Sequence, residues 1–228
     1  MCLILSIETA TKVCSAALLE KDRVLGSQEL YVERSHSEFL AVMIQDLLKY
    51  AGKTPDDLSA VAVSKGPGSY TGLRIGVSTA KGLCFGLDIP LISVNSLLAM
   101  AYEIRNYNID EFDLCPMLDA RRMEVYFLIT DHELRIKQHT EAKIVDENSF
   151  AAELRTNRIL FFGNGMNKCR DILNQHKKAR FVDNIHPKAC NIGFLAYEKF
   201  NKQEFENTET FEPFYLKDFI ATTPKKLI

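Results

Sequence analysis

The sequence predicts an α/β protein whose two halves repeat one arrangement: a meander of three short strands, followed by strands that alternate with helices. In each half, short apolar runs separated by turn residues come first, and segments with apolar residues every three to four positions follow. A carboxylate, Glu8 or Asp119, ends the leading strand of each half, and Val13 or Val125 opens the next strand soon after it. We interpret this as a weak internal repeat.

Length and charge limit the class of protein. The 228 residues, 46% of them apolar, are enough for one large domain or two lobes of about 100 residues each. The net charge of -2 and a pI near 6.2 argue against a protein that binds nucleic acid unaided, because neutralising phosphates requires a concentrated basic face. Any role with RNA would therefore be shared with a partner.

The first half carries clear helix boundary signals. Ser35 and Glu38 have capping-box spacing, Gly52 ends the helix that follows, and Asn95-Ser96 can cap another helix. In chain order, the predicted elements are strands Cys2–Ile7, Val13–Leu19 and Val24–Val32, helix Ser37–Tyr50, strand Ala60–Val63, helix Thr71–Leu87, strand Pro90–Val94 and helix Leu97–Arg105.

The polar residues Asn106, Asn108 and Asp110 are typical of a junction, so we predict lobes at 1–106 and 107–228, with the extreme C-terminal segment packing back on the first lobe. The predicted elements of the second half are strands Leu114–Leu118, Val125–Thr130 and Leu134–His139, helix Asp146–Arg155, strand Ile159–Phe162, and helices Asn167–Gln175 and Pro187–Phe200. The duplicated pattern suggests the two-lobe actin/sugar-kinase/Hsp70-like (ASKHA, ribonuclease H-like) fold.

Two observations concern the cellular compartment. Met1 to Ile7 has neither a basic region nor a cleavage site, and no later apolar run approaches the roughly 18 residues of a membrane span, so we expect neither signal peptide nor anchor. The six cysteines form no C-x-x-C pair. We expect free thiols, a reducing environment and a cytoplasmic location.

The loop Gly66-Pro67-Gly68-Ser69 lies between a predicted strand and a predicted helix. Backbone N–H groups and the positive end of a helix dipole could hold an anion there. Alternatively, the loop is only a tight turn, with Ser69 or Thr71 as helix cap. The residues alone favour the turn and leave the anion site open.

The helix after this loop contains Gly72, Gly76 and Gly82 as well as Ser78 and Ala80. Each interior glycine costs about 1 kcal/mol relative to alanine, so something must offset the loss. Small side chains allow two helices to pack closely. The packing partner could be the first helix of this lobe, another chain, or both.

The segment Gly66 to Gly76, GPGSYTGLRIG, resembles the signature of the TsaB family, and the likeness extends over nearly the whole chain. Further segments similar to that family are Ile7–Thr11, His36–Glu38, Asp119–Tyr126, Gly163–Gly165 and Pro213–Lys217. The departures are Glu8, where the family usually has aspartate, and Lys217, where arginine is common.

An ATPase or phosphotransferase of this fold needs a carboxylate and a glycine in each phosphate loop, so that amides reach the phosphates and Mg²⁺ is held between the lobes. The first loop here, Glu8–Thr11, lacks its glycine, and the second has bulky Arg121 after Asp119-Ala120. Gly163-Asn164-Gly165 is too short a signal to restore a nucleotide site. We therefore predict no cofactor, with Gly66, Gly68 and Ser69 as at most a vestigial anion loop.

The sequence also lacks the motifs that are typical of a metal site or of a catalytic nucleophile. The catalytic relative TsaD holds a metal with a histidine pair on a helix, but the position four after His36 is Leu40, and no carboxylate is arranged between His132 and His139. We predict no metal and take His36 as a helix-start residue whose ring bonds nearby backbone. Ser69, Ser78 and the cysteines lie in no G-x-S-x-G or comparable elbow.

The resemblance implies a non-catalytic accessory subunit in threonylcarbamoylation of the adenosine beside the anticodon (t6A). TsaD would be the main partner, TsaE would join the pair, and tRNA would be met only within the complex. We expect the two N-lobe helices to pack against those of TsaD, or of a second copy when the chain is alone. The predicted interface residues are Phe39, Met43, Leu47, Leu73, Gly76, Val77, Ala80 and Cys84. The alternatives are an autonomous ASKHA-type kinase or ATPase and a glycoprotease-like peptidase.

Overall fold

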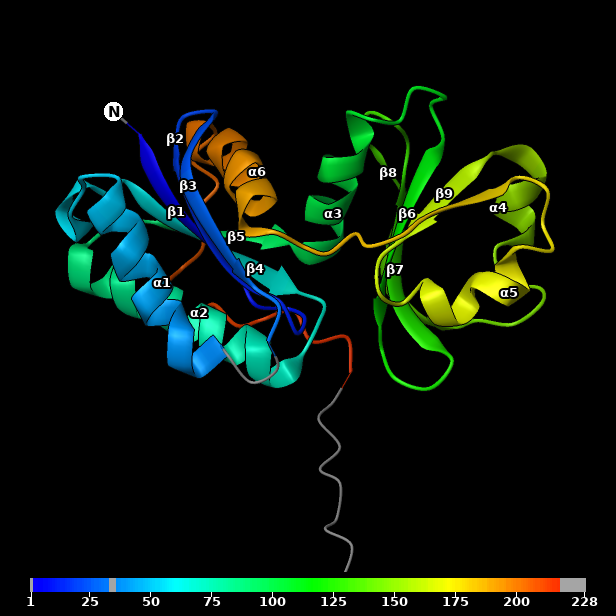
Figure 1. The fold of residues 1–228 in the computed structure, drawn as a ribbon, viewed down its shortest axis with the longest axis horizontal. Coiled ribbons are helices and arrows are strands. Elements are labelled where there is room, and N and C mark those ends of the chain that lie inside the picture. The colour runs from blue at the N-terminus through cyan, green and yellow to red at the C-terminus, as the bar shows by residue number, and fades with distance from the viewer. Residues whose placement is uncertain (1, 33–35, 218–228) are drawn as a thin grey trace, which may run out of the picture.

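Two five-stranded sheets form the framework of the computed structural model, which describes residues 2–32 and 36–217 (Figure 1). The first sheet has the order β3-β2-β1-β4-β5, with β1 Leu3–Glu8, β2 Cys14–Glu20, β3 Arg23–Leu30, β4 Ala60–Gly66 and β5 Leu91–Asn95. The second has the order β10-β9-β6-β7-β8, with β6 Asp113–Asp119, β7 Glu124–Thr130, β8 Ile136–Ile144, β9 Ile159–Phe162 and β10 Ala179–Val182. The helices are α1 His36–Tyr50, α2 Tyr70–Leu87, α3 Ser96–Arg105, α4 Ala151–Thr156, α5 Arg170–Leu173 and α6 Ala189–Asn201, and short 3₁₀ turns lie at Pro55–Asp57 and Asn167–Cys169.

The two sheets have the same topology, which confirms the predicted duplication. The leading strand β1 pairs antiparallel with β2 and parallel with β4, and β6 pairs in the same way with β7 and β9. Both leading strands are central and almost fully buried. Glu8 and Asp119 end equivalent strands, so the carboxylate repeat in the sequence reflects a repeat in the fold.

Helices cover both faces of the first sheet. Because strand side chains alternate between faces, Leu5 and Ile7 belong to the apolar cluster under α1 and α2. Ile4, which precedes Leu5 and points to the opposite face, belongs to a second cluster that includes Ile192 and Ala196 of α6. The helix α6 therefore packs on the first sheet, although it follows the last strand of the second.

The helix α3 likewise packs on the sheet of the other half of the chain. It follows the last strand of the first sheet, yet Leu97, Met100 and Ile104 belong to one cluster with Leu114 and Phe162 of the second sheet. The predicted division at residue 106 therefore separates both helices from the sheets that they cover. The periodicity of a helix shows that it has an apolar face, but not which sheet that face meets.

Contacts between the exchanged helices join the two lobes. Lys188 Nζ, just before α6, lies 2.6 Å from Glu103 Oε1 of α3, and Asn191 Nδ2 donates to Glu103 Oε2 at 3.1 Å. Figure 1 shows α3 and α6 side by side between the sheets. The lobes are thus held together by packed helices.

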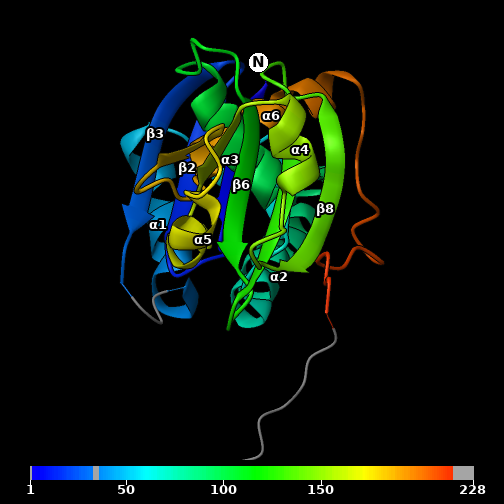
Figure 2. The same cartoon turned by 90° about the vertical axis from the view of Figure 1, so that its right-hand side faces the viewer.

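The chain beyond α6 returns along the first lobe. The N–H of Glu206 donates to Leu91 O at 2.8 Å, and the N–H of Phe214 donates to Lys65 O at 2.7 Å. Lys81 Nζ of α2 donates to the carbonyls of Glu209 and Phe211, both at 3.1 Å. Figure 2 shows this segment passing down the side of the molecule where β8 lies.

Several element predictions differ from the structure. The strand β10 was not predicted, and β8 runs five residues beyond its predicted end at His139. The helix predicted from Asp146 begins only at Ala151, after Phe150 in the left-handed region with φ 62°. The predicted cap Ser35 lies outside the described residues.

None of the helices within residues 2–32 and 36–217 is long and apolar enough to cross a membrane.

Candidate functional site

Equivalent turns follow the leading strands of the two sheets, at the ends where ligands bind in open α/β sheets. The first turn joins β1 to β2 after Glu8, and the second joins β6 to β7 after Asp119. Two glycine-containing loops lie beside them: 66–69 after β4, and 163–165 after β9. These loops are where a phosphate site would be built.

Glu8 is fully buried. Its Oε1 accepts from the Ala10 N–H at 2.5 Å and from the Ser64 hydroxyl at 2.9 Å, while Oε2 has no partner within the described residues. Burial raises the pKa of Glu8 to about 7, against the lowering effect of these hydrogen bonds. A carboxyl that is sealed from water and half neutral near pH 7 is poorly suited to hold Mg²⁺ or its waters.

The backbone amides of the first turn point inward. The Ala10 N–H is bonded to Glu8, the Thr9 N–H donates to Ser64 Oγ at 3.5 Å, and the Val13 N–H donates to Thr11 Oγ1 at 3.2 Å. A phosphate loop needs free amides directed at the ligand. Here three amides are used within the protein.

The amides of the second turn are used in the same way. The Asp119 N–H donates to Asn164 Oδ1 at 3.0 Å, the Ala120 N–H to Glu124 O at 3.0 Å, and the Arg121 N–H to Asp119 Oδ1 at 2.8 Å. Lys168 forms an ion pair with the Asp119 carboxylate. The acidic residue at the end of β6 is thus already neutralised by this chain.

The loop at 66–69 closes over the first turn. The Ser69 N–H donates to Ala10 O at 2.7 Å, and a Cβ on Gly68 would lie 2.3 Å from the same oxygen. Ser69 caps α2 by accepting from the Gly72 N–H at 3.3 Å. The structure therefore gives Ser69 the capping role and makes glycine at 68 a requirement of packing.

The glycines of α2 form two groups. A Cβ on Gly72 would lie 2.1 Å from Thr9 O, and one on Gly76 would lie 2.3 Å from Thr9 Oγ1. These two positions thus allow α2 to approach the first turn, rather than α1 or another chain. A Cβ on Gly82 or Gly86 would meet no atom of residues 2–32 and 36–217 within 4 Å.

The predicted interface residues lie mainly inside the first lobe. Phe39 is 42% exposed, whereas the other seven are buried: Met43, Leu47, Leu73, Gly76, Val77, Ala80 and Cys84. The apolar periodicity identified the face of each helix that meets the sheet. The face open to a partner is the opposite one, with Val42 49% exposed on α1 and Phe85 82% exposed on α2.

The residues that could bind a metal or act as a nucleophile do not lie together in one site. Within the described part of the chain no three His, Cys, Asp or Glu side chains are placed to hold a metal. His36 is buried, and its Nε2 has no partner among these residues. Burial raises the pKa of Cys14 and of Cys84 to about 11, which disfavours the thiolate that a nucleophile requires.

Two surface hollows lie away from the phosphate-loop positions. One, of about 410 Å³, lies beside Asp113 and Arg158 at the start of the second sheet. The other, of about 450 Å³, lies between β5, β8 and α6, with an apolar wall that includes Leu98 and Leu195. Neither is lined by residues of the turns after Glu8 and Asp119.

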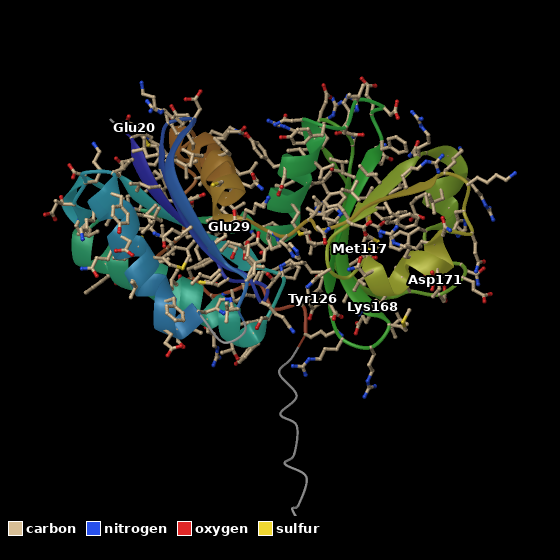
Figure 3. The ribbon with its side chains drawn as sticks, viewed as in Figure 1. Glu20, Glu29, Met117, Tyr126, Lys168 and Asp171 are labelled. Carbon is tan, nitrogen blue, oxygen red and sulfur yellow. The ribbon has the colours of Figure 1, made fainter. Side chains whose placement is uncertain are left out.

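A cluster of cations and aromatic rings lies at the junction of the lobes and was not found from the sequence. The Arg74 guanidinium carbon lies 4.2 Å from the Tyr70 ring centroid, and Arg74 Nε donates to the Tyr215 hydroxyl at 3.3 Å. Lys217 forms an ion pair with Glu124. These residues are up to 141 positions apart, so no local spacing could reveal them. Figure 3 shows Tyr126 and Lys168 at the end of the second lobe that faces this junction.

Comparisons with known proteins find relatives named for tRNA threonylcarbamoyladenosine biosynthesis. Residues 30–225 match a family model described as "TsaD: tRNA N6-adenosine threonylcarbamoyltransferase". The TsaB protein of Bacillus subtilis, a "tRNA threonylcarbamoyladenosine biosynthesis protein", is 31% identical over 206 residues, which are 86% of this chain and 87% of that protein. The Escherichia coli TsaB protein is 40% identical over 54% of this chain and 53% of its own length. The structure of YeaZ from Pseudomonas aeruginosa is similar with a TM-score of 0.80 and 27% identity, over 95% of this chain and all of that one. The likeness over both lobes, together with the duplicated ASKHA topology, shows that the chain belongs to the TsaB (YeaZ-like) family of tRNA threonylcarbamoyladenosine biosynthesis proteins.

Proposed function

We propose that this chain is a non-catalytic cytoplasmic subunit that binds TsaD and, together with TsaE, supports transfer of the threonylcarbamoyl group to the adenosine beside the anticodon. Membership of the TsaB family supports the pathway. The observation that carries the non-catalytic role is the use of the loop amides: in both turns, the groups that would bind phosphates are bonded within the protein.

The electrostatics of the turns support the same proposal. Phosphoryl-transfer sites hold Mg²⁺ with ionised carboxylates that the metal or its waters can reach. Glu8 is sealed and has a pKa raised to about 7, and Asp119 is paired with Lys168. Neither carboxylate is free to act as a ligand in this arrangement.

The surface proposed for TsaD is the outer face of α1 and α2, defined by Phe39, Val42, Gly82, Phe85 and Gly86. These helices lie side by side on one face of the first sheet (Figure 1). Three apolar side chains on this face are at least 42% exposed, and exposed apolar groups of this kind favour a protein partner. In the lone chain, a second copy would use the same surface.

Gly82 and Gly86 strengthen this choice of surface. Each costs about 1 kcal/mol of helix stability relative to alanine, and no atom of the described residues lies close enough to require a glycine. A helix of another chain packed closely beside Phe85 would offset that loss.

The first experiment is in vitro modification of tRNA by TsaD, TsaE and threonylcarbamoyl-adenylate, with and without this chain. We expect t6A to form efficiently only when the chain is present. Equal amounts of product in both reactions would contradict the accessory role. ATP hydrolysis by the purified chain alone that is lost in Glu8→Gln would favour the kinase alternative, and zinc-dependent proteolysis would favour the peptidase alternative.

The second experiment tests the surface. Phe85→Arg should abolish co-purification with TsaD by placing an unpaired charge in an apolar interface, while the lone chain keeps its melting temperature because Phe85 is exposed. The matched control is Tyr107→Arg, at a side chain that is 79% exposed on the loop between α3 and β6. Retained binding by the Phe85 variant would exclude this face. Arginine at Val77 or Ala80 is not a suitable test, because both side chains are in the core.

A further inference from the structure

The junction face, defined here by Arg74, Arg121, Arg122, Lys168 and Lys217, brings cations from three separate parts of the chain together. Arg74 lies in the first turns of α2, Lys217 in the segment after α6, and the other three in the second lobe. The contacts of Arg74 with Tyr215, and of Lys217 with Glu124, join these parts into one surface.

Arg74 is held in place by aromatic contacts. Its guanidinium lies over the Tyr70 ring, the Tyr70 and Tyr215 rings are 4.9 Å apart, and its Nε–H is used by the Tyr215 hydroxyl. The two terminal nitrogens of the guanidinium have no ion-pair partner among the described residues. These nitrogens can therefore donate two hydrogen bonds to one anion, such as a phosphate.

Arg121 and Arg122 lie at the tip of the β6–β7 turn with positive φ angles of 70° and 49°. The turn is fixed by the Arg121 N–H bond to Asp119 and by the Glu124 N–H bond to Arg121 O at 3.2 Å. Both arginines are exposed, and within residues 2–32 and 36–217 no ion pair engages either guanidinium. A rigid turn thus presents two uncompensated charges.

The nearby carboxylates do not cancel this excess. Asp119 is paired with Lys168, and Glu124 with Lys217. Among the described residues, Glu212 is close enough to act electrostatically on Arg74. In the part of the chain that the structure describes, no ion pair engages Arg74, Arg121 or Arg122. This face therefore carries an excess of positive charge, although the whole chain carries a net charge of -2.

We propose that the junction face binds the phosphodiester backbone of tRNA within the complex, an inference that rests on the proposed accessory function. An extended polyanion suits charges spread over both lobes and the C-terminal segment, whereas a mononucleotide would need the loop amides that are bonded internally. Arginine guanidinium groups are well suited to phosphate oxygens. The net negative charge of the chain explains why binding would require the partner's contribution.

The test measures the affinity of the complete TsaB-family–TsaD–TsaE complex for unmodified tRNA at several salt concentrations, using the variant Arg121→Glu/Arg122→Glu. The loss of two phosphate contacts should weaken binding about tenfold at physiological salt and reduce the slope of log K against log salt by about 1.4. Arg121→Lys/Arg122→Lys should retain most of the salt dependence. The matched control, Arg155→Glu/Lys177→Glu, changes the charge equally at exposed positions on the outer flank of the second lobe and should bind like the wild type.

Each other outcome overturns the inference. Unchanged tRNA affinity and salt slope in the glutamate variant would exclude the junction face as a tRNA-binding surface. An equal loss of tRNA affinity in the control variant would show that the effect depends only on the total charge of the chain. Loss of TsaE recruitment or of ATP binding, with tRNA affinity intact, would assign the face to a protein or a nucleotide. The melting temperature of the glutamate variant shows whether it folds, and its binding to TsaD in the absence of tRNA shows whether it still assembles. If t6A formation did not require this chain, the accessory function would fail; if only the tRNA affinity were unchanged, this inference alone would fail.

Discussion

The buried carboxyl group of Glu8 makes the free energy of unfolding depend on pH. Its pKa in the folded chain is about 7, above the ordinary 4.5, so the folded state retains a proton that the unfolded state loses between these values. Below pH 4.5 both states are protonated and the carboxyl brings no penalty. Between pH 4.5 and 7 the unfolded state ionises while the folded carboxyl stays largely protonated, so stability falls as pH rises, and the loss is complete once pH has passed the folded pKa of about 7.

We therefore predict that Glu8→Gln stabilises the chain increasingly as pH rises from 5 to 8. The amide can still accept the Ala10 and Ser64 hydrogen bonds and never ionises. From the pKa shift, the gain above pH 7 is at most roughly 3 kcal/mol. Denaturant unfolding at pH 5, 6, 7 and 8 measures it, with Glu147→Gln at an exposed position as the control. A constant difference between variant and wild type across this range would refute the assignment of a raised pKa.

The cysteines give a second prediction at this scale. Cys14, Cys84, Cys115 and Cys169 are buried, and burial raises the pKa of each thiol. Cys2 and Cys190 are partly exposed. A thiol-specific disulfide reagent at pH 8 should label at most these two positions in the native chain and all six after unfolding. Rapid labelling of Cys115 in the native protein, detected by mass spectrometry, would contradict the packing of the second lobe.

At the scale of elements, α2 gives opposite predictions for glycines on its two sides. Gly76→Ala should destabilise the chain by about 1–3 kcal/mol, because its Cβ would overlap Thr9. Gly82→Ala should stabilise the lone chain by up to about 1 kcal/mol, because the space is open and alanine favours the helix. Thermal unfolding of both variants under one condition tests the pair. Equal effects of the same sign would show that the two glycines do not have different environments.

Local signals predicted many element boundaries but not what each element packs against. Ser69 and Asn95 do cap helices, by accepting hydrogen bonds from amides of the following turn, because capping depends on residues close in sequence. The four-residue strand Ala179–Val182 gave no such signal. It is set between charged residues, and its pairing with β9 is a tertiary contact. The start of α4 was misplaced because Phe150 adopts a positive φ that is uncommon for a bulky residue.

The candidate site was predictable only in part for the same reason. The weak phosphate loops could be read from Glu8–Thr11 and Asp119–Arg121, since the missing glycine and the bulky arginine are local features. The inward amides and the Lys168–Asp119 ion pair depend on the folded backbone. Apart from Phe39, the predicted interface residues are buried, because the apolar stripe of each helix faces the sheet in this lobe. The position of the partner surface therefore stays a proposal.

The whole molecule shows that the two lobes depend on each other. Without α6, one face of the first sheet would expose Ile4 and Ala62, which now pack in one cluster with Ile192. Without the second sheet, α3 would expose Leu97 and Met100. Apolar surface of this extent favours aggregation or partial unfolding in an isolated fragment.

We therefore predict that fragments 1–106 and 107–228 do not fold independently, although each contains five predicted or observed strands of one sheet. The full chain should unfold in one cooperative transition, because α3 and α6 fix each lobe to the other. A fusion of residues 1–95 to 187–217 should restore cooperative melting, since it returns α6 to the first sheet and removes α3. Circular dichroism and calorimetry would follow all four proteins. Cooperative melting of fragment 1–106, or two separate transitions in the full chain, would show that the exchanged helices are dispensable for the stability of each lobe.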